Sequence, residues 1–174
     1  MFWKKSLSRR MKEEAVSLGL CAQWNAEWDN NASDDDVAEM FIRGIEFCID
    51  KNWPSVEIIK SYRDMMRRHC IYADDTVSLT NPKVAVLNGS TDANIKYEWM
   101  DSGEIYVRHK SILHLKAKGL SRVFVNLYDD AEIHAETEDS ARVFVYQYGG
   151  RIIEAKGDVT VRDRHNFKRR IKTE

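Results

Sequence analysis

Two histidines and a glutamate recur at intervals of about twenty residues, at His114, His134 and Glu154. Imidazole and carboxylate groups are ordinary zinc ligands. If residues twenty apart lay on adjacent strands, about 4.8 Å from each other, two imidazoles could share one ion. Such a column would be exposed, however, and no surrounding residues are identifiable that would orient the ligands. We therefore interpret these residues as a polar outer ladder and expect neither a metal nor another cofactor.

The basic C-terminal stretch "RDRHNFKRRIKTE" is the second candidate site. Cationic and aromatic side chains together suit phosphate contacts and stacking on bases. The residues that we predict to contact a partner or nucleic acid are Arg162, Arg164, Phe167, Lys168, Arg169, Arg170 and Lys172. A solubilising tail, or a segment that docks on an acidic partner, would have the same composition.

No glycine-rich phosphate loop and no Gly-x-Ser-x-Gly nucleophile motif occurs in the chain. Acidic pairs are common, but none lies in a context that would raise a carboxyl pKa in a recognisable cleft. We therefore expect a protein that is not an enzyme.

The back half of the chain must position the histidine column, and its hydrophobic period is two from Lys83 onward. Apolar pairs two residues apart recur about every ten residues, and turn-forming stretches such as "DSG", "KGLS" and "EDSA" separate them. This pattern predicts nine short strands. Their inward pairs are Val84/Val86, Ile95/Tyr97, Ile105/Val107, Leu113/Leu115, Val123/Val125, Ile133/Ala135, Val143/Val145, Ile153/Ala155 and Val159/Val161.

Nine such strands fit either an antiparallel β-meander or sandwich, or a short β-solenoid with two strands in each coil of about twenty residues. Outward residues at the twenty-residue step favour the solenoid, because like residues recur there. The columns read Ala85, Tyr106, Phe124, Phe144, Thr160; then Lys96, His114, His134, Glu154; and then Glu98, Lys116, Glu136, Lys156. The last column alternates in charge, which stabilises neighbouring strands. The solenoid predicts an exposed aromatic ladder of Tyr106, Phe124 and Phe144, with Tyr128 over Tyr148 near a corner.

The front half has the spacing of three amphipathic helices. Gly19 should bend or end the first helix, Ser33 with Asp36 should cap the second, and Pro54 should open the third. Trp24 and Trp28 are predicted core aromatics, and "YADDTVSLTNP" is predicted to be turn-rich. The predicted fold class is therefore α+β: a three-helix segment over 1–75, a β-repeat domain over 83–162 and a basic tail over 163–174.

Composition restricts where such a protein works. Apolar residues make up 43% and charged residues 32% of the chain, and no apolar run approaches a membrane span. Three cysteines without a Cys-x-x-Cys motif favour a reducing compartment. We expect the cytoplasm of a bacterial host or a virion as the location, and no membrane contact.

Several stretches resemble small uncharacterised proteins encoded by gut Bacteroides and their tailed phages: "GLCAQW", "FIRGIEFC", "IYVRHKSILHL", "VFVNLYDDAEI", "ARVFVYQYGG" and "GDVTVRDR". The resemblance implies a phage or prophage origin and supplies no catalytic residues. We expect a structural or adaptor protein that assembles through its β-repeat domain, as a homo-oligomer or with components of a phage particle. The alternative is a regulatory protein of host takeover that contacts nucleic acid or an acidic partner through its basic termini.

Overall fold

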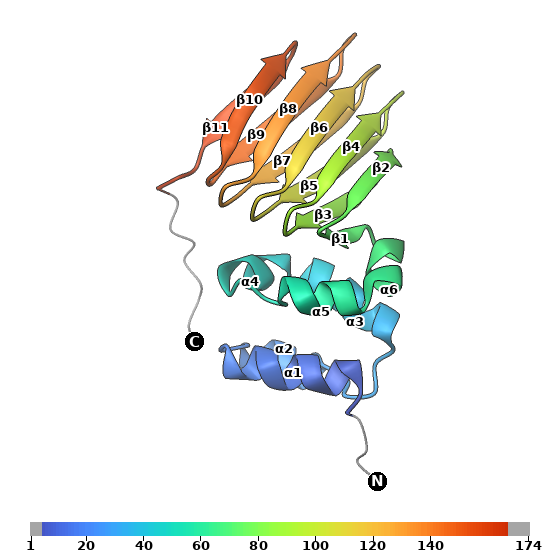
Figure 1. The fold of residues 1–174 in the computed structure, drawn as a ribbon, viewed down its shortest axis with the longest axis vertical. Coiled ribbons are helices and arrows are strands. Elements are labelled where there is room, and N and C mark those ends of the chain that lie inside the picture. Colours follow the sequence, from blue (N-terminus) through green and yellow to red (C-terminus); the bar gives the residue numbers. More distant parts are fainter. Residues whose placement is uncertain (1–4, 167–174) are drawn as a thin grey trace. The chain divides into compact units, whose positions relative to one another are not determined.

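The computed structural model describes residues 5–166, which divide into two compact units on either side of the His69–Cys70 bond. The first unit is helical, and the second consists of parallel strands wound into a short β-solenoid (Figure 1). The predicted α+β class and the solenoid are therefore confirmed, and the antiparallel meander is wrong.

The helical unit contains six helices within the described residues, where three were predicted. They are α1 (Leu7–Ser17), α2 (Ala22–Glu27), α3 (Asp34–Arg43), α4 (Ile45–Asp50), α5 (Val56–Ser61) and α6 (Arg63–Arg68). Gly44 separates α3 from α4, because glycine weakens a helix interior. Tyr62 separates α5 from α6, and nothing in the sequence accounts for that break.

The predicted helix ends are partly confirmed. Gly19 has a φ of 94° and follows α1; its N–H donates to Val16, and that of Leu20 donates to Ala15, which closes the helix in a Schellman motif. Ser33 and Asp36 form a reciprocal capping box at α3. The prediction for Pro54 is wrong, because α5 begins at Val56 and Ser55 is its N-cap.

The core of the helical unit is apolar with one polar exception. Trp28 is buried as predicted, whereas Trp24 is only half-buried and lies under Arg43, 5.3 Å from its guanidinium carbon. The buried Ser8 hydroxyl accepts from Trp28 Nε1 at 2.9 Å and donates to the Asp29 carbonyl at 2.6 Å. Each buried polar group of this pair is therefore satisfied.

The β-repeat unit has eleven strands within the described residues, where nine were predicted. They are β1 (Ile71–Ala73), β2 (Thr76–Thr80), β3 (Val84–Asn88), β4 (Asp92–Tyr97), β5 (Ser102–Val107), β6 (Ile112–Ala117), β7 (Arg122–Leu127), β8 (Glu132–Thr137), β9 (Arg142–Gln147), β10 (Arg151–Lys156) and β11 (Val159–Asp163). The two additional strands, β1 and β2, lie in the stretch that we predicted to be turn-rich. The repeat therefore begins at Ile71, before residue 83 where it was predicted to begin. Val77 and Leu79 of β2 already alternate with exposed threonine and serine, which is the pattern of a strand.

The strands form two parallel sheets (Figure 1). The odd-numbered strands make the six-stranded sheet β1-β3-β5-β7-β9-β11, and the even-numbered strands make the five-stranded sheet β10-β8-β6-β4-β2. Successive strands therefore alternate between sheets, and residues about twenty apart are hydrogen-bonded neighbours. Val123 pairs with Val143, and Ile133 pairs with Leu113.

The turns explain the ten-residue beat. Each six-residue strand in the middle of the unit is followed by a four-residue turn closed by a backbone hydrogen bond, as from Ser111 to Arg108 and from Ala141 to Glu138. The second residue of each turn has a positive φ: Trp99, His109, Gly119, Asp129 and Asp139. The turns of successive coils are also hydrogen-bonded to each other, as from the N–H of Leu120 to the carbonyl of Trp99.

Inward side chains of both sheets form one continuous core between them. Its largest member in mid-unit is Tyr97, which is fully buried and donates its hydroxyl to the Pro82 carbonyl at 2.6 Å. Burial raises the pKa of this phenol above its ordinary value. Gly103 lies so close to the Tyr97 hydroxyl and the Pro82 carbonyl that a Cβ would overlap both, so the glycine makes room for the ring.

Candidate interaction surfaces

The outer face of the six-stranded sheet carries the predicted aromatic ladder in part. The rings of Phe124 and Phe144 are stacked, with centroids 5.3 Å apart and planes at 15°. Tyr106 is not part of this stack, because the residue paired with Phe124 on the preceding strand is Glu104. The prediction placed β5 two residues out of register with β7. The inward positions of β5 are Gly103, Ile105 and Val107, and a glycine gives no apolar signal in the sequence.

Tyr106 belongs to a second column on the same face. It pairs with Asn126, which pairs with Tyr146, which pairs with Arg162. The Asn126 amide donates to the Glu104 carboxylate at 2.9 Å, and the Arg162 guanidinium lies 5.9 Å from the centre of the Tyr146 ring. Half-buried aromatic rings and polar groups therefore alternate over this face.

The first column also begins differently from the prediction. Ala85 is fully buried and belongs to the core, while Val84 and Val86 occupy the alternate positions of β3. Four consecutive apolar residues, Val84 to Leu87, leave the inward pair ambiguous in the sequence. Tyr128 and Tyr148 are stacked as predicted, with ring centroids 4.8 Å apart and planes at 6°.

On the outer face of the five-stranded sheet, His114 and His134 are stacked as predicted, with ring centroids 4.8 Å apart. Glu154 pairs with His134 as expected, but the residue beneath His114 is Asn94, not Lys96. Ala93 is the inward residue that the sequence analysis overlooked, so β4 was placed two residues out of register. Among residues 5–166, no three histidine, cysteine or acidic side chains are placed to hold a metal ion.

The predicted charge column is half right. Lys116 and Glu136 form an ion pair at 3.4 Å, and Lys156 pairs with Glu136 along the backbone. The Lys156 ammonium also holds the pKa of Glu154 below its ordinary value through a hydrogen bond. Glu98 does not belong to this column: β4 ends at Tyr97, and Lys96 lies next to Lys116 instead.

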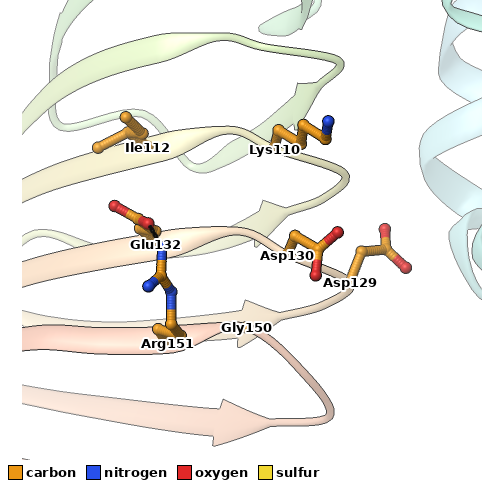
Figure 2. Close-up of a pocket in the computed structure, with 7 residues that line it drawn as sticks. All are labelled: Lys110, Ile112, Asp129, Asp130, Glu132, Gly150 and Arg151. Carbon is orange, nitrogen blue, oxygen red and sulfur yellow. Dashed lines mark hydrogen bonds and ion pairs between the residues drawn. The ribbon is translucent and has the colours of Figure 1, made fainter.

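A shallow charged groove of about 420 Å³ lies where β6, β8 and β10 begin (Figure 2). It is lined by Lys110, Ile112, Asp129, Asp130, Glu132, Gly150 and Arg151. Figure 2 shows Arg151 directed at Glu132, with which it forms an ion pair. Asp129 accepts a hydrogen bond from the His109 N–H at 2.8 Å. Positive and negative groups largely neutralise each other here, so the groove does not favour a ligand of either charge.

An exposed apolar corner lies at the turns that follow β4 and β6, and the sequence analysis missed it. Trp99 is 78% exposed, Met100 77% and Leu120 55%. Large apolar residues at turn positions were the available signal, because isolated apolar residues are normal at a surface and adjacent ones are less so.

The last strands leave the end of the solenoid uncovered within the described residues. Val145 on β9 is fully buried, but Val161, its neighbour on β11, is 42% exposed. Ile153 is 49% exposed and is the extra residue of a bulge in β10. By contrast, all three residues of β1 are buried.

The basic tail is described only in part. Arg162 lies on β11, where its side chain contacts Tyr146, and Arg164 follows that strand, with its N–H donating to the Gln147 carbonyl. The other predicted contact residues, Phe167, Lys168, Arg169, Arg170 and Lys172, lie outside the described residues.

Comparison of the chain with protein-family models, with curated proteins and with solved structures finds no match in any of the three. Within residues 5–166, no helix has the length and apolar character needed to cross a membrane.

Proposed function

We propose that this protein is a non-enzymatic structural or adaptor protein, of phage or prophage origin, that assembles with copies of itself through its β-repeat unit. The origin rests on the resemblance described above. The assembly rests on one observation, which is the uncovered last coil.

In the last coil, the positions that continue the interior are partly open to solvent, although the corresponding positions of the preceding coil are fully buried. Val143 and Val145 are fully buried, whereas their partners Val159 and Val161 are half-buried and 42% exposed. Burying such side chains contributes about 25 cal/mol per Å² of apolar surface. The edge of the last strand also presents backbone groups that can pair with another strand. The burial of these valines and the pairing of the backbone groups both favour association.

Analytical ultracentrifugation over a wide concentration range tests the proposal. We expect the native chain to pass from monomer to a defined oligomer, and Val161→Lys to shift it toward monomer. Val16→Lys is a matched control, because Val16 on α1 is 44% exposed and far from the repeat in sequence. A native chain that stays monomeric at the highest concentration contradicts the proposal, and so does an equal effect of both variants.

A further inference from the structure

We infer that two copies of this chain pair through β11, antiparallel, about a two-fold axis that passes beside Thr160. This inference rests on the proposed function and specifies the contact that assembly uses. It follows from the direction of the backbone groups at the edge, from the side chains on the strand and from the short length of β1.

The backbone of β11 offers hydrogen-bonding groups on its outer side. Asp158 accepts from the Val143 N–H at 3.0 Å, and the Arg164 N–H donates to Gln147 at 2.7 Å, so even-numbered residues face β9. Backbone groups of alternate residues point to opposite sides of a strand. Val161, Asp163 and the Val159 carbonyl therefore face the outer edge, whereas the Val159 N–H donates to the Gly157 carbonyl at 3.1 Å. None of the described strands pairs with that edge.

The side chains of β11 are self-complementary in one antiparallel register. With Thr160 opposite Thr160 of the second copy, Val159 lies opposite Val161. Asp158, which directly precedes β11 and forms an ion pair with Arg142 of its own chain at 3.2 Å, lies opposite Arg162. Each pair occurs twice because of the two-fold symmetry. Both valine positions continue the interior of the sheet, and opposite charges across neighbouring strands are stabilising.

Other registers are poorer. Moving the axis to Val161 places Val159 opposite Asp163, so that a carboxylate meets the apolar interior. A shift of the pairing by one residue places inward residues opposite outward ones. Parallel stacking of β11 on β11 would place Asp158 on Asp158 and Arg162 on Arg162, which is repulsive.

The second copy contributes the same edge, because β1 at the opposite edge of the six-stranded sheet is a poorer partner. It has only three residues, too few to pair with the five residues of β11 along their length. A contact that uses the same surface on both copies closes after two chains. We therefore expect a dimer and not a fibre.

Disulfide trapping tests the register. Thr160 would form a non-hydrogen-bonded pair with its own copy, with Cα atoms about 4.5 Å apart, a separation that a disulfide can span. The exposed Cys21 is first changed to serine. In that background Thr160→Cys should convert most of the chain to a reducible dimer on mild oxidation. The matched control is Thr80→Cys. Thr80, like Thr160, is an exposed threonine on an edge strand, in this case β2 of the other sheet.

Two outcomes separate this inference from the proposed function. If the native chain is oligomeric but Thr160→Cys cross-links no better than Thr80→Cys, assembly stands and the β11 contact is wrong. If the native chain is monomeric, the proposed function fails as well.

A charge substitution tests the ion pairs independently. Arg162→Glu places a carboxylate opposite Asp158 in each of the two symmetry-related pairs, and we expect the dimer dissociation constant to rise about tenfold. Arg122→Glu makes the same change in net charge on β7, away from the edge, and should leave the constant within about twofold. Equal effects of the two variants would overturn the register.

Discussion

At the scale of single residues, His109 is a titratable group of the repeat that is held by both burial and a hydrogen bond. Its Nδ1 accepts the Gly89 N–H at 2.9 Å, which requires the neutral imidazole. Burial first, and then the nearby Arg108 charge, lower the pKa of His109 below its ordinary value. Its backbone has a φ of 57°, which asparagine tolerates better than most residues.

We predict that this histidine makes the fold acid-sensitive. Below about pH 6.5 the unfolded chain binds the imidazole proton more readily than the folded chain, so the free energy of unfolding falls as pH falls. His109→Asn keeps an acceptor near Gly89 and does not titrate. Urea unfolding at about pH 7.5 and about pH 5.5 should show a smaller difference in this variant than in the native chain. An unchanged difference would show that other groups set the acid response.

At the scale of elements, the turn following β4 is strained. Asp129, Asp139 and Gly119 occupy the corresponding positive-φ positions in other turns, and these residue types accept that conformation. Trp99 has a φ of 62° and an indole that is 78% exposed, so the ring gains little burial in return. A bulky residue in this conformation costs of order 1–2 kcal/mol.

Trp99→Asn should therefore stabilise the protein, raising the free energy of unfolding by about 1 kcal/mol. Met100→Asn is the control, because Met100 is 77% exposed and its φ is not positive. Urea denaturation of both variants measures the difference. A loss of stability in Trp99→Asn would mean that the indole makes a contact worth more than the strain.

The strands of this fold can be predicted from the sequence more fully than their register or the helix breaks. The alternation of inward valines and the recurrence of turns every ten residues predict short strands but do not separate a solenoid from a meander. Like residues at outward positions twenty apart favour the solenoid, because only parallel stacking makes such residues neighbours. The register within columns is harder to predict, since Gly103 and Ala93 occupy inward positions that larger apolar residues take elsewhere. The break at Gly44 has a local cause in the glycine, whereas nothing in the sequence marks the break at Tyr62.

For the candidate surfaces, stacking of identical residues was predictable and exposure was not. The pairs Phe124/Phe144, His114/His134 and Tyr128/Tyr148 follow directly from the twenty-residue step. The exposure of Val161 depends on which strand has no further neighbour, and the sequence pattern of β11 is the same as that of a covered strand.

At the scale of the whole molecule, the response to salt distinguishes the two functional hypotheses. Assembly through buried valines should weaken by less than tenfold when salt is raised from low to molar concentrations, because only exposed ion pairs are screened. Nucleic-acid contact through the basic termini would fall by orders of magnitude over the same range. Sedimentation of the chain alone, and titration of labelled DNA and RNA, measure the two responses. Tight, salt-sensitive nucleic-acid binding would favour the regulatory hypothesis.

Because β1 is buried and β11 is exposed, the two edges of the six-stranded sheet differ, and the coils can be added in one order only. Each coil hydrogen-bonds to the coil before it, so a chain emerging from the ribosome can add finished coils one at a time onto a completed template. Each coil added in this way presents its outer backbone groups at a new edge, as β11 does at the edge of the six-stranded sheet, so every stage of addition offers an edge for pairing.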